Sequence, residues 1–302
     1  MRKFNKTTII LYMIVGSLTF SRDSNRVETA NKKVLKNNII YIENEETPFT
    51  GKIIDKNIQE EYKDGIRNGL FKGVFLDDGE VYLYEGRYLE GIKHGVWKIM
   101  YADGEIRGNL EYSYDKPCGQ WKYFYKNKIL EGYENFEDGV LSGRIEYFDK
   151  SGNVNIDTSY YKGLLNGKFV KYHSKDRVDV IANFHYGKLN GTIKFFSKEG
   201  PLLLEGKYFQ NKRVDFWKLF YNSGDIKTTI NYKDGKKDGE MIIYDKAGME
   251  MERVIYKDGK ELGNEKDSSE LHQNKRDKLI NKFKTFSREL YYEKYNEILS
   301  KL

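Results

Sequence analysis

Apolar and polar residues alternate along much of the chain, in short segments that end at glycine-containing turns. In one such segment, Ile226, Thr228 and Ile230 alternate with Lys227 and Thr229. A period of two bounded by glycine turns is typical of half-buried strands that are joined as hairpins. The pattern therefore predicts a mainly β protein built from antiparallel hairpins.

The hairpins repeat with a period of 24 residues. An aromatic residue begins each unit, at Tyr88, Tyr112, Phe136, Tyr160, Phe184, Tyr208, Tyr232 and Tyr256, and Tyr62 begins an earlier unit that is offset by two residues. Each unit is expected to contain two strands and two turns. Neighbouring strands lie about 4.8 Å apart, so eight or nine units predict a single, twisted, elongated sheet of roughly 80–90 Å.

Glycine recurs three and seven positions after each leading aromatic residue, and the only exceptions are Asp and Asn. Glycine adopts positive φ without steric cost, and Asn and Asp are the next residues to tolerate it. We therefore interpret both columns as turn-forming. The predicted structural turn residues are Gly91, Gly95, Gly139, Gly143, Gly163, Gly167, Gly187, Gly191, Asn211, Asp215, Gly235 and Gly239.

A third column, two residues after the second glycine, contains all three tryptophans of the chain. No second sheet is evident in the sequence to bury the apolar face of the predicted array, and large exposed apolar patches usually mark interaction sites. The aromatic residues in and near this column are therefore the predicted partner-binding residues. They are Trp97, Trp121, Phe169, Trp217, Tyr101, Tyr125 and Tyr221.

The two ends of the chain differ from the repeats. Residues 1–21 combine a basic start with an apolar run of about fourteen residues, which is typical of a secretory signal peptide, with an uncleaved anchor as the alternative. Residues 22–37 are expected to be a linker and 38–263 the repeat domain. Residues 264–302 are expected to form an amphipathic helix, with Leu279, Phe283, Phe286 and Leu290 on one side. Such a helix would cap the last strand or cover part of the apolar face, or else bind a partner or a second copy.

The segment from Tyr84 to Trp97, which reads YEGRYLEGIKHGVW, resembles the MORN repeat. With its 24-residue period, the region from about Phe49 to Gly263 looks most like the bacterial MORN-variant proteins grouped as YwqK-like and often labelled antitoxins. The units at Tyr112 and Tyr208 depart from the MORN pattern, because the first lacks one of the two glycines and the second lacks both. The resemblance implies a toxin-neutralising immunity protein, which a secretory signal does not suit.

Composition argues against several other classes of function. The net charge of +6 comes from interleaved acids and bases, whereas a nucleic-acid surface requires clustered cations. Cys118 is the only cysteine, and His94, His173, His185 and His272 show no metal-ligand spacing. The Gly-x-x-x-Gly pairs lack the Gly-Lys-Ser/Thr ending of a phosphate loop. We therefore expect no catalytic residue, metal or cofactor, and no nucleic-acid partner.

These observations favour a non-enzymatic, exported repeat scaffold at the cell envelope, the periplasm or the cell surface, which binds a protein partner or an envelope surface through its aromatic residues. An antitoxin of the YwqK-like type is the first alternative, and phospholipid or membrane-surface binding is the second. If residues 1–21 are not a signal, the expected location is the cytoplasm. The sequence does not identify the partner or the oligomeric state.

Overall fold

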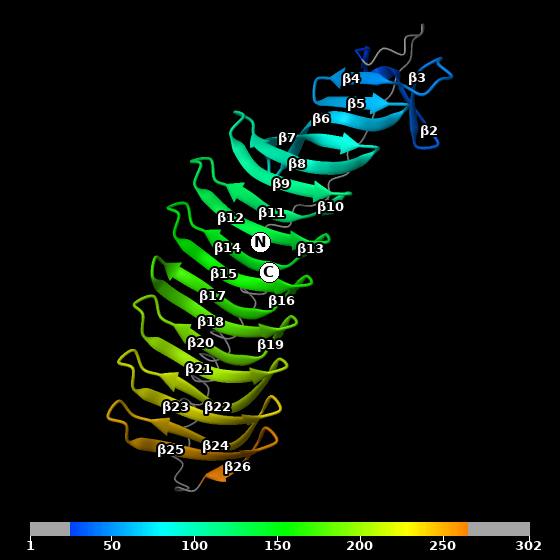
Figure 1. Cartoon of the computed structure of the whole chain (residues 1–302). Helices are drawn as coiled ribbons and strands as arrows, with labels where there is room; N and C mark the ends of the chain where they lie inside the picture. The colour runs from blue at the N-terminus through cyan, green and yellow to red at the C-terminus, as the bar shows by residue number, and fades with distance from the viewer. Residues whose placement is uncertain (1–24, 265–302) are drawn as a thin grey trace.

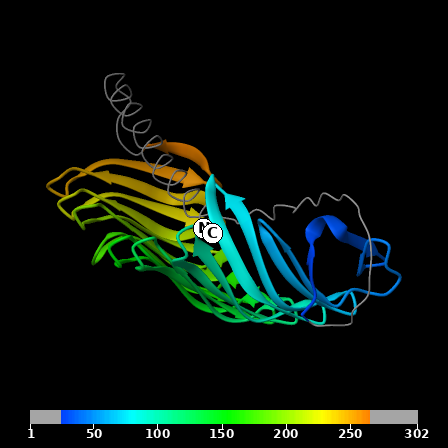
Figure 2. The ribbon, with the colours of Figure 1, turned by 90° about the horizontal axis from the view of Figure 1, so that it is seen from above.

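The computed structural model describes residues 25–264, and the statements below concern that part of the chain. It contains one sheet of 24 strands and a separate sheet of two strands. Figures 1 and 2 show that the large sheet is a long single layer bent into a trough. The mainly β architecture of repeated hairpins is thus as the sequence predicts. The signal expected over residues 1–21, and the helix expected over 264–302 apart from Asn264, lie outside the described residues.

The N-terminal part of the described chain contains the elements that precede the regular repeats. The elements are β1 (Val27–Thr29), the 3-10 helix η1 (Ala30–Lys32), β2 (Lys33–Lys36), β3 (Ile39–Ile42), β4 (Gly51–Asp55), β5 (Ile58–Lys63) and β6 (Ile66–Asp77). Strands β2 and β3 form the two-stranded sheet, and β1 runs parallel to β4, whereas the other pairings are antiparallel.

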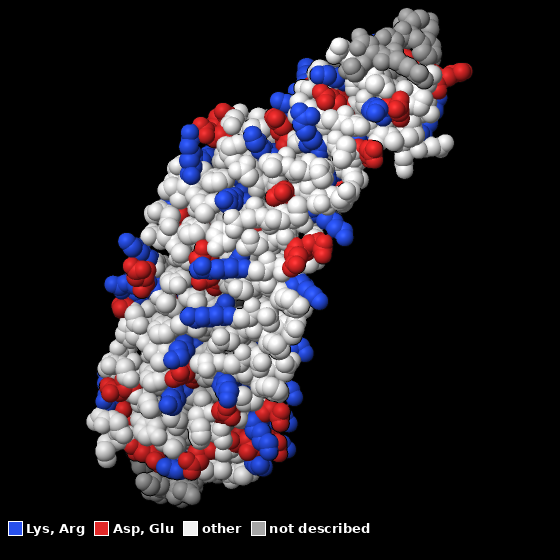
Figure 3. Space-filling model, viewed as in Figure 1, with Lys and Arg blue, Asp and Glu red and all other residues white. Residues whose placement is uncertain are grey.

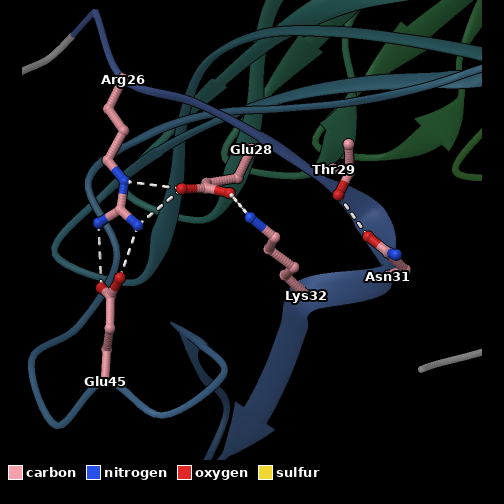
Figure 4. Close-up of polar contacts among 6 residues, drawn as sticks. All are labelled: Arg26, Glu28, Thr29, Asn31, Lys32 and Glu45. Atoms are coloured by element: carbon pink, nitrogen blue, oxygen red, sulfur yellow. Dashed lines mark hydrogen bonds and ion pairs between the residues drawn. The ribbon is translucent and has the colours of Figure 1, made fainter. Parts of the chain in front are cut away.

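Residues 27–36, which belong to the linker expected over 22–37, lie in β1, η1 and β2. Ion pairs hold this segment in place (Figure 4). The Arg26 guanidinium contacts Glu45 at 2.5 Å and Glu28 at 2.7 Å, and Lys32 reaches Glu28 at 3.1 Å. Arg26 and Glu45 are 19 residues apart in the sequence, so no local pattern could have indicated the contact.

Full-length strands of the repeats alternate in direction along the rest of the sheet. They are β7 (Glu80–Leu89), β8 (Ile92–Tyr101), β9 (Ile106–Ser113), β11 (Gly119–Phe124), β12 (Leu130–Glu137), β14 (Gly143–Phe148), β15 (Val154–Tyr161), β17 (Gly167–Ser174), β18 (Arg177–His185), β20 (Gly191–Phe196), β21 (Leu202–Phe209), β22 (Lys212–Phe220), β23 (Ile226–Lys233), β24 (Lys236–Tyr244), β25 (Glu250–Lys257) and β26 (Lys260–Asn264).

Four two-residue strands precede the second glycine position in the middle repeats, where the ladder is interrupted. They are β10 (Lys116–Pro117), β13 (Val140–Leu141), β16 (Leu164–Leu165) and β19 (Lys188–Leu189). From β8 onward, a register shift also lies near the other turn of each hairpin, for example between Tyr147 and Phe148. Such bulges bend a strand and increase its twist, which suits a curved single-layer sheet.

The first turn of each repeat has positive φ at both central residues, as in Asp138 at 48° and Gly139 at 88°. Two positive φ values define the type I′ hairpin turn, whose twist matches that of the flanking strands. This geometry explains why glycine, Asn or Asp occupies the second central position. All twelve predicted turn residues have positive φ, including Asn211 at 66° and Asp215 at 59°.

Backbone bonds between successive repeats tie this edge of the sheet together. The N–H of the residue at the first glycine position donates to a carbonyl one repeat earlier, as Gly163 does to Leu141 at 2.8 Å and Gly187 to Leu165 at 2.7 Å. Asp115 and Asn211 make the same backbone bond, to Lys93 and to Leu189. Each repeat thus contacts its neighbours through a ladder that runs along the turns, in keeping with a repeat architecture.

Candidate interaction surface

One face of the sheet, here called the buried face, carries most of the predicted partner-binding residues. Trp97 is 0%, Phe169 1% and Trp217 2% exposed. A side chain that is covered to this extent has no surface to offer a partner. The partner-binding role predicted for these three residues is thus not supported by their position, and their packing makes them parts of the core.

Trp97 and Trp217 are buried because a glycine stands beside each of them on the preceding strand. A Cβ atom at Gly86 would fall within the indole of Trp97, and one at Gly206 within that of Trp217. The corresponding residue before Trp121 is Leu110. Trp121 is only half-buried, and its Nε1 donates to the carbonyl of Glu111 at 2.8 Å.

The three predicted tyrosines make bonds between repeats. The hydroxyls of Tyr101, Tyr125 and Tyr221 each donate at 2.8 Å to a backbone carbonyl 23 residues further along, at Phe124, Phe148 and Tyr244. Burial raises the pKa of Tyr101 and of Tyr125, which keeps these hydroxyls protonated donors. These side chains link the second turns of successive repeats, as the backbone bonds link the first turns.

Cationic side chains lie over the aromatic rings of the buried face. The ammonium of Lys93 is 4.8 Å from the ring centre of Trp97 and 4.9 Å from that of Tyr112. It is also 3.0 Å from the hydroxyl of Tyr84. Burial lowers the pKa of Lys93. Arg213 takes the equivalent place 4.8 Å from the centre of Trp217. Such contacts stabilise a desolvated cation and cover the ring.

A carboxylate divides the buried face into two hydrophobic clusters. Glu134 stands in the column that holds Gly86 and Gly206, and it accepts hydrogen bonds from the hydroxyls of Tyr123 and Tyr147. Burial, followed by the charge of Glu134, raises the pKa of both tyrosines. One cluster extends from Phe71 to Tyr123, and the larger one from Ile145 to Tyr256.

The opposite face, here called the open face, carries an aromatic row that sequence reasoning missed. Its members lie 24 residues apart, each next to a strand end, and each is half-buried. They are Met100, Phe124, Phe148, Tyr172, Phe196, Phe220 and Tyr244. The 24-residue register that revealed the tryptophan column could also have revealed this row.

Aliphatic residues fill the spaces between the aromatic ones. On the adjacent strand, an aliphatic residue lies directly opposite each of the first six members. These partners are Ile106, Leu130, Val154, Val178, Leu202 and Ile226. The row and its aliphatic partners are here called the open-face stripe. The stripe crosses thirteen full-length strands from β8 to β24. At about 4.8 Å a strand it is roughly 58 Å long.

A row of mostly polar residues, here called the central ladder, runs beside the stripe on the same face. Its directly paired members are Lys72, Glu85, Lys98, Asn109, Lys122, Tyr133, Glu146, Asp157, Val170, Ile181, Lys194, Glu205, Lys218 and Thr229. It contains residues of both signs, such as Lys72 and Glu85, which are 3.1 Å apart, and Lys194 and Glu205, which are 3.0 Å apart. Figure 3 shows acids and bases interleaved over the visible face, with broad uncharged areas between them. A hollow of about 290 Å³ lies at the β8 end of the stripe, lined in part by Ile58, Val74 and Met100.

Within residues 25–264, no three His, Cys, Asp or Glu side chains are grouped as metal ligands would be. The same residues include no helix with the length and apolar character needed to cross a membrane. Comparison of the sequence with protein families and with curated proteins finds no match.

Proposed function

We propose that the chain is a non-enzymatic repeat scaffold that binds a protein partner along the open-face stripe. The observation that carries the proposal is the row of half-exposed aromatic residues that recurs in register on the face opposite the buried one. Tyr, Phe and Met are enriched in the centres of protein interfaces. We therefore propose Phe124, Phe148, Phe196 and their neighbours as the binding residues, in place of the tryptophans.

The surroundings of the stripe favour a protein over a membrane or a nucleic acid. Ion pairs of both signs, such as Lys194 with Glu205, flank the apolar centre. An apolar centre with a polar rim is the usual anatomy of a protein interface. Membrane surfaces and nucleic acids select clustered cations. With the central ladder, the surface is about 14 Å wide and about 58 Å long, or roughly 800 Å², which is the standard size for one side of an interface.

We further propose that the repeats are of the MORN type, that residues 264–302 form an amphipathic helix, and that the scaffold is exported and meets its partner at the cell envelope. The repeat resemblance rests on the segment from Tyr84 to Trp97, and export rests on the pattern of residues 1–21. A toxin as the partner would identify the scaffold as an immunity protein of the YwqK-like type.

Photo-cross-linking in living cells identifies the partner. A benzophenone side chain at position 148 or 196 is expected to capture one protein species. Phe216, which is 63% exposed on the same face but outside the stripe, provides the control position. The captured species is named by mass spectrometry, and its binding to the purified chain is then measured.

Phe148→Lys and Phe196→Lys are expected to weaken that binding by tenfold or more, since each places a charge in the apolar centre, which costs over about 1.4 kcal/mol. Phe216→Lys is expected to leave it unchanged. Equal affinity for all three variants would exclude the stripe as the binding surface. Flotation of the wild-type chain with anionic vesicles, and no captured protein, would replace the proposal by membrane binding.

A further inference from the structure

Small and medium-sized side chains of the buried face have no exposed surface in the region of the larger hydrophobic cluster. Val180, Met241 and Val254 are each 0% exposed. Among the described elements, contacts run between neighbouring strands of the sheet. A small side chain on a one-layer sheet has open space above it unless taller neighbours or a second layer cover it. Within residues 25–264, no element supplies that layer over strands β14 to β25.

Val254 is fully buried although it lies near the end of the described sheet. It lies on β25, next to the last described strand, and faces Met241 on one side and the backbone of Asn264 on the other. A valine so close to the end of an array would be expected to retain some exposure. Lys237 covers part of this region, since its ammonium is 4.5 Å from the ring centre of Tyr256 and 3.7 Å from the sulfur of Met241.

We propose that residues 268–302 of the same chain form the missing layer, as an amphipathic helix that lies lengthwise on the buried face from β26 back to β14. The segment begins four residues after Asn264, where the sheet ends. It contains neither glycine nor proline, and Leu279, Phe283, Phe286 and Leu290 fall on one side at helical spacing.

The length of the segment matches the length of the surface. A helix of 35 residues extends about 52 Å. The larger hydrophobic cluster runs from Ile145 to Tyr256 over ten full-length strands, or roughly 48 Å. It ends where Glu134 and its two tyrosines introduce polar groups into the face. The smaller cluster, which contains Trp97, lies beyond the reach of such a helix.

This division provides a test with an internal control, because Trp217 belongs to the larger cluster and Trp97 to the smaller one. Two full-length proteins are prepared in which the other two tryptophans are replaced by Phe, so that one reports on position 217 and the other on position 97. Phe283→Asp with Phe286→Asp is then introduced into both. Asn281→Asp with Thr285→Asp, on the opposite side of the proposed helix, is the matched control.

Phe283→Asp with Phe286→Asp is expected to red-shift the emission of Trp217 and to increase its quenching by acrylamide several-fold. The emission and quenching of Trp97 are expected to stay unchanged. The control variants are expected to change neither tryptophan. A Trp217 that remains shielded in Phe283→Asp with Phe286→Asp would overturn the proposal.

A benzophenone at position 286 of the otherwise unmodified full-length chain gives a second, independent readout. Cross-links within one chain to peptides of strands β20 to β24 are expected. Cross-links between two copies, or none to the sheet, would overturn the proposal even if the variants fail to fold. Neither result bears on the open-face stripe, so this proposal and the proposed function fail separately.

Discussion

The indole of Trp217 occupies the space in which a side chain at Gly206 would lie, and Trp97 stands in the same relation to Gly86. Trp121, which follows Leu110 in the equivalent place, remains half-buried. At Trp97 and Trp217, the glycine on the preceding strand therefore makes the room that the large indole ring needs. This relationship makes the tryptophan column part of the packing of the sheet.

Gly206→Ala is expected to destabilise the protein by about 1–3 kcal/mol, because the added methyl group forces the indole of Trp217 out of its place. Gly108 is the matched control, since a Cβ there would make only ordinary contacts, the nearest at 3.4 Å. Gly108→Ala is expected to change stability by less than about 1 kcal/mol. Urea unfolding followed by circular dichroism measures both, and equal losses would contradict the packing relationship.

The tyrosine hydroxyls that link the second turns are expected to contribute about 1 kcal/mol each. Tyr125→Phe removes the donor to the Phe148 carbonyl while retaining the ring. Tyr101→Phe does the same one repeat earlier and Tyr221→Phe four repeats later, so the triple variant is expected to lose roughly 3 kcal/mol. Tyr161→Phe, at a residue that is 41% exposed, is the control. A triple variant as stable as wild type in urea unfolding would show that these bonds are energetically neutral.

Asn211 has two roles in its turn, one through its backbone conformation and one through its side chain. Its φ of 66° satisfies the turn, and its Oδ1 accepts a hydrogen bond at 2.7 Å from the N–H of Leu189 in the preceding repeat. Asn211→Gly loses only the bond, about 1 kcal/mol, whereas Asn211→Ala also incurs the cost of positive φ, about 1–2 kcal/mol more. The expected order of stability in urea is wild type, then Gly, then Ala. A glycine variant more stable than wild type would show that the side-chain bond contributes nothing.

The repeat, its hairpins and its turns are predictable because they depend on local conformation. Asp138 and Gly139 have the positive φ values that their types favour, and the 24-residue register makes this local preference visible many times. The sequence is enough to predict that Asn211 lies in a turn. The sequence does not predict the hydrogen bond from Leu189 to Asn211, because the two residues lie 22 apart and meet only through the register between repeats.

Which of the two aromatic columns stays partly exposed was not predictable from the period alone. Trp97 and Phe124 belong to two aromatic columns with the same spacing, and both columns fit a pleated strand. Their exposure depends on what packs on each face and on which neighbour is small enough to admit a large ring. The sequence indicates no second layer over the apolar face, which predicts that the tryptophans are exposed. In the structure Trp97 and Trp217 are buried.

The carboxylate of Glu60 links the N-terminal hairpin to the first repeats. Its Oε2 lies 2.5 Å from the ammonium of Lys33 and 2.7 Å from the hydroxyl of Tyr62, and its Oε1 lies 2.7 Å from the guanidinium of Arg67. Burial alone would raise the pKa of Glu60, but Lys33, Arg67 and the Tyr62 hydroxyl outweigh it and hold the pKa below its ordinary value.

Because the folded-state pKa of Glu60 is depressed, its contribution to stability is complete above the unfolded value of about 4.3 and is lost as the pH falls through the folded value. Glu60→Gln is expected to cost about 3–5 kcal/mol at pH 7, since it leaves Lys33 without its charge partner. Below about pH 4 the free energy of unfolding of wild type is expected to fall more steeply than that of the variant. Urea unfolding from pH 7 to pH 3 measures both curves, with Glu85→Gln in the more exposed pair with Lys72 as the control. Parallel curves for wild type and Glu60→Gln would show that Glu60 does not titrate with folding.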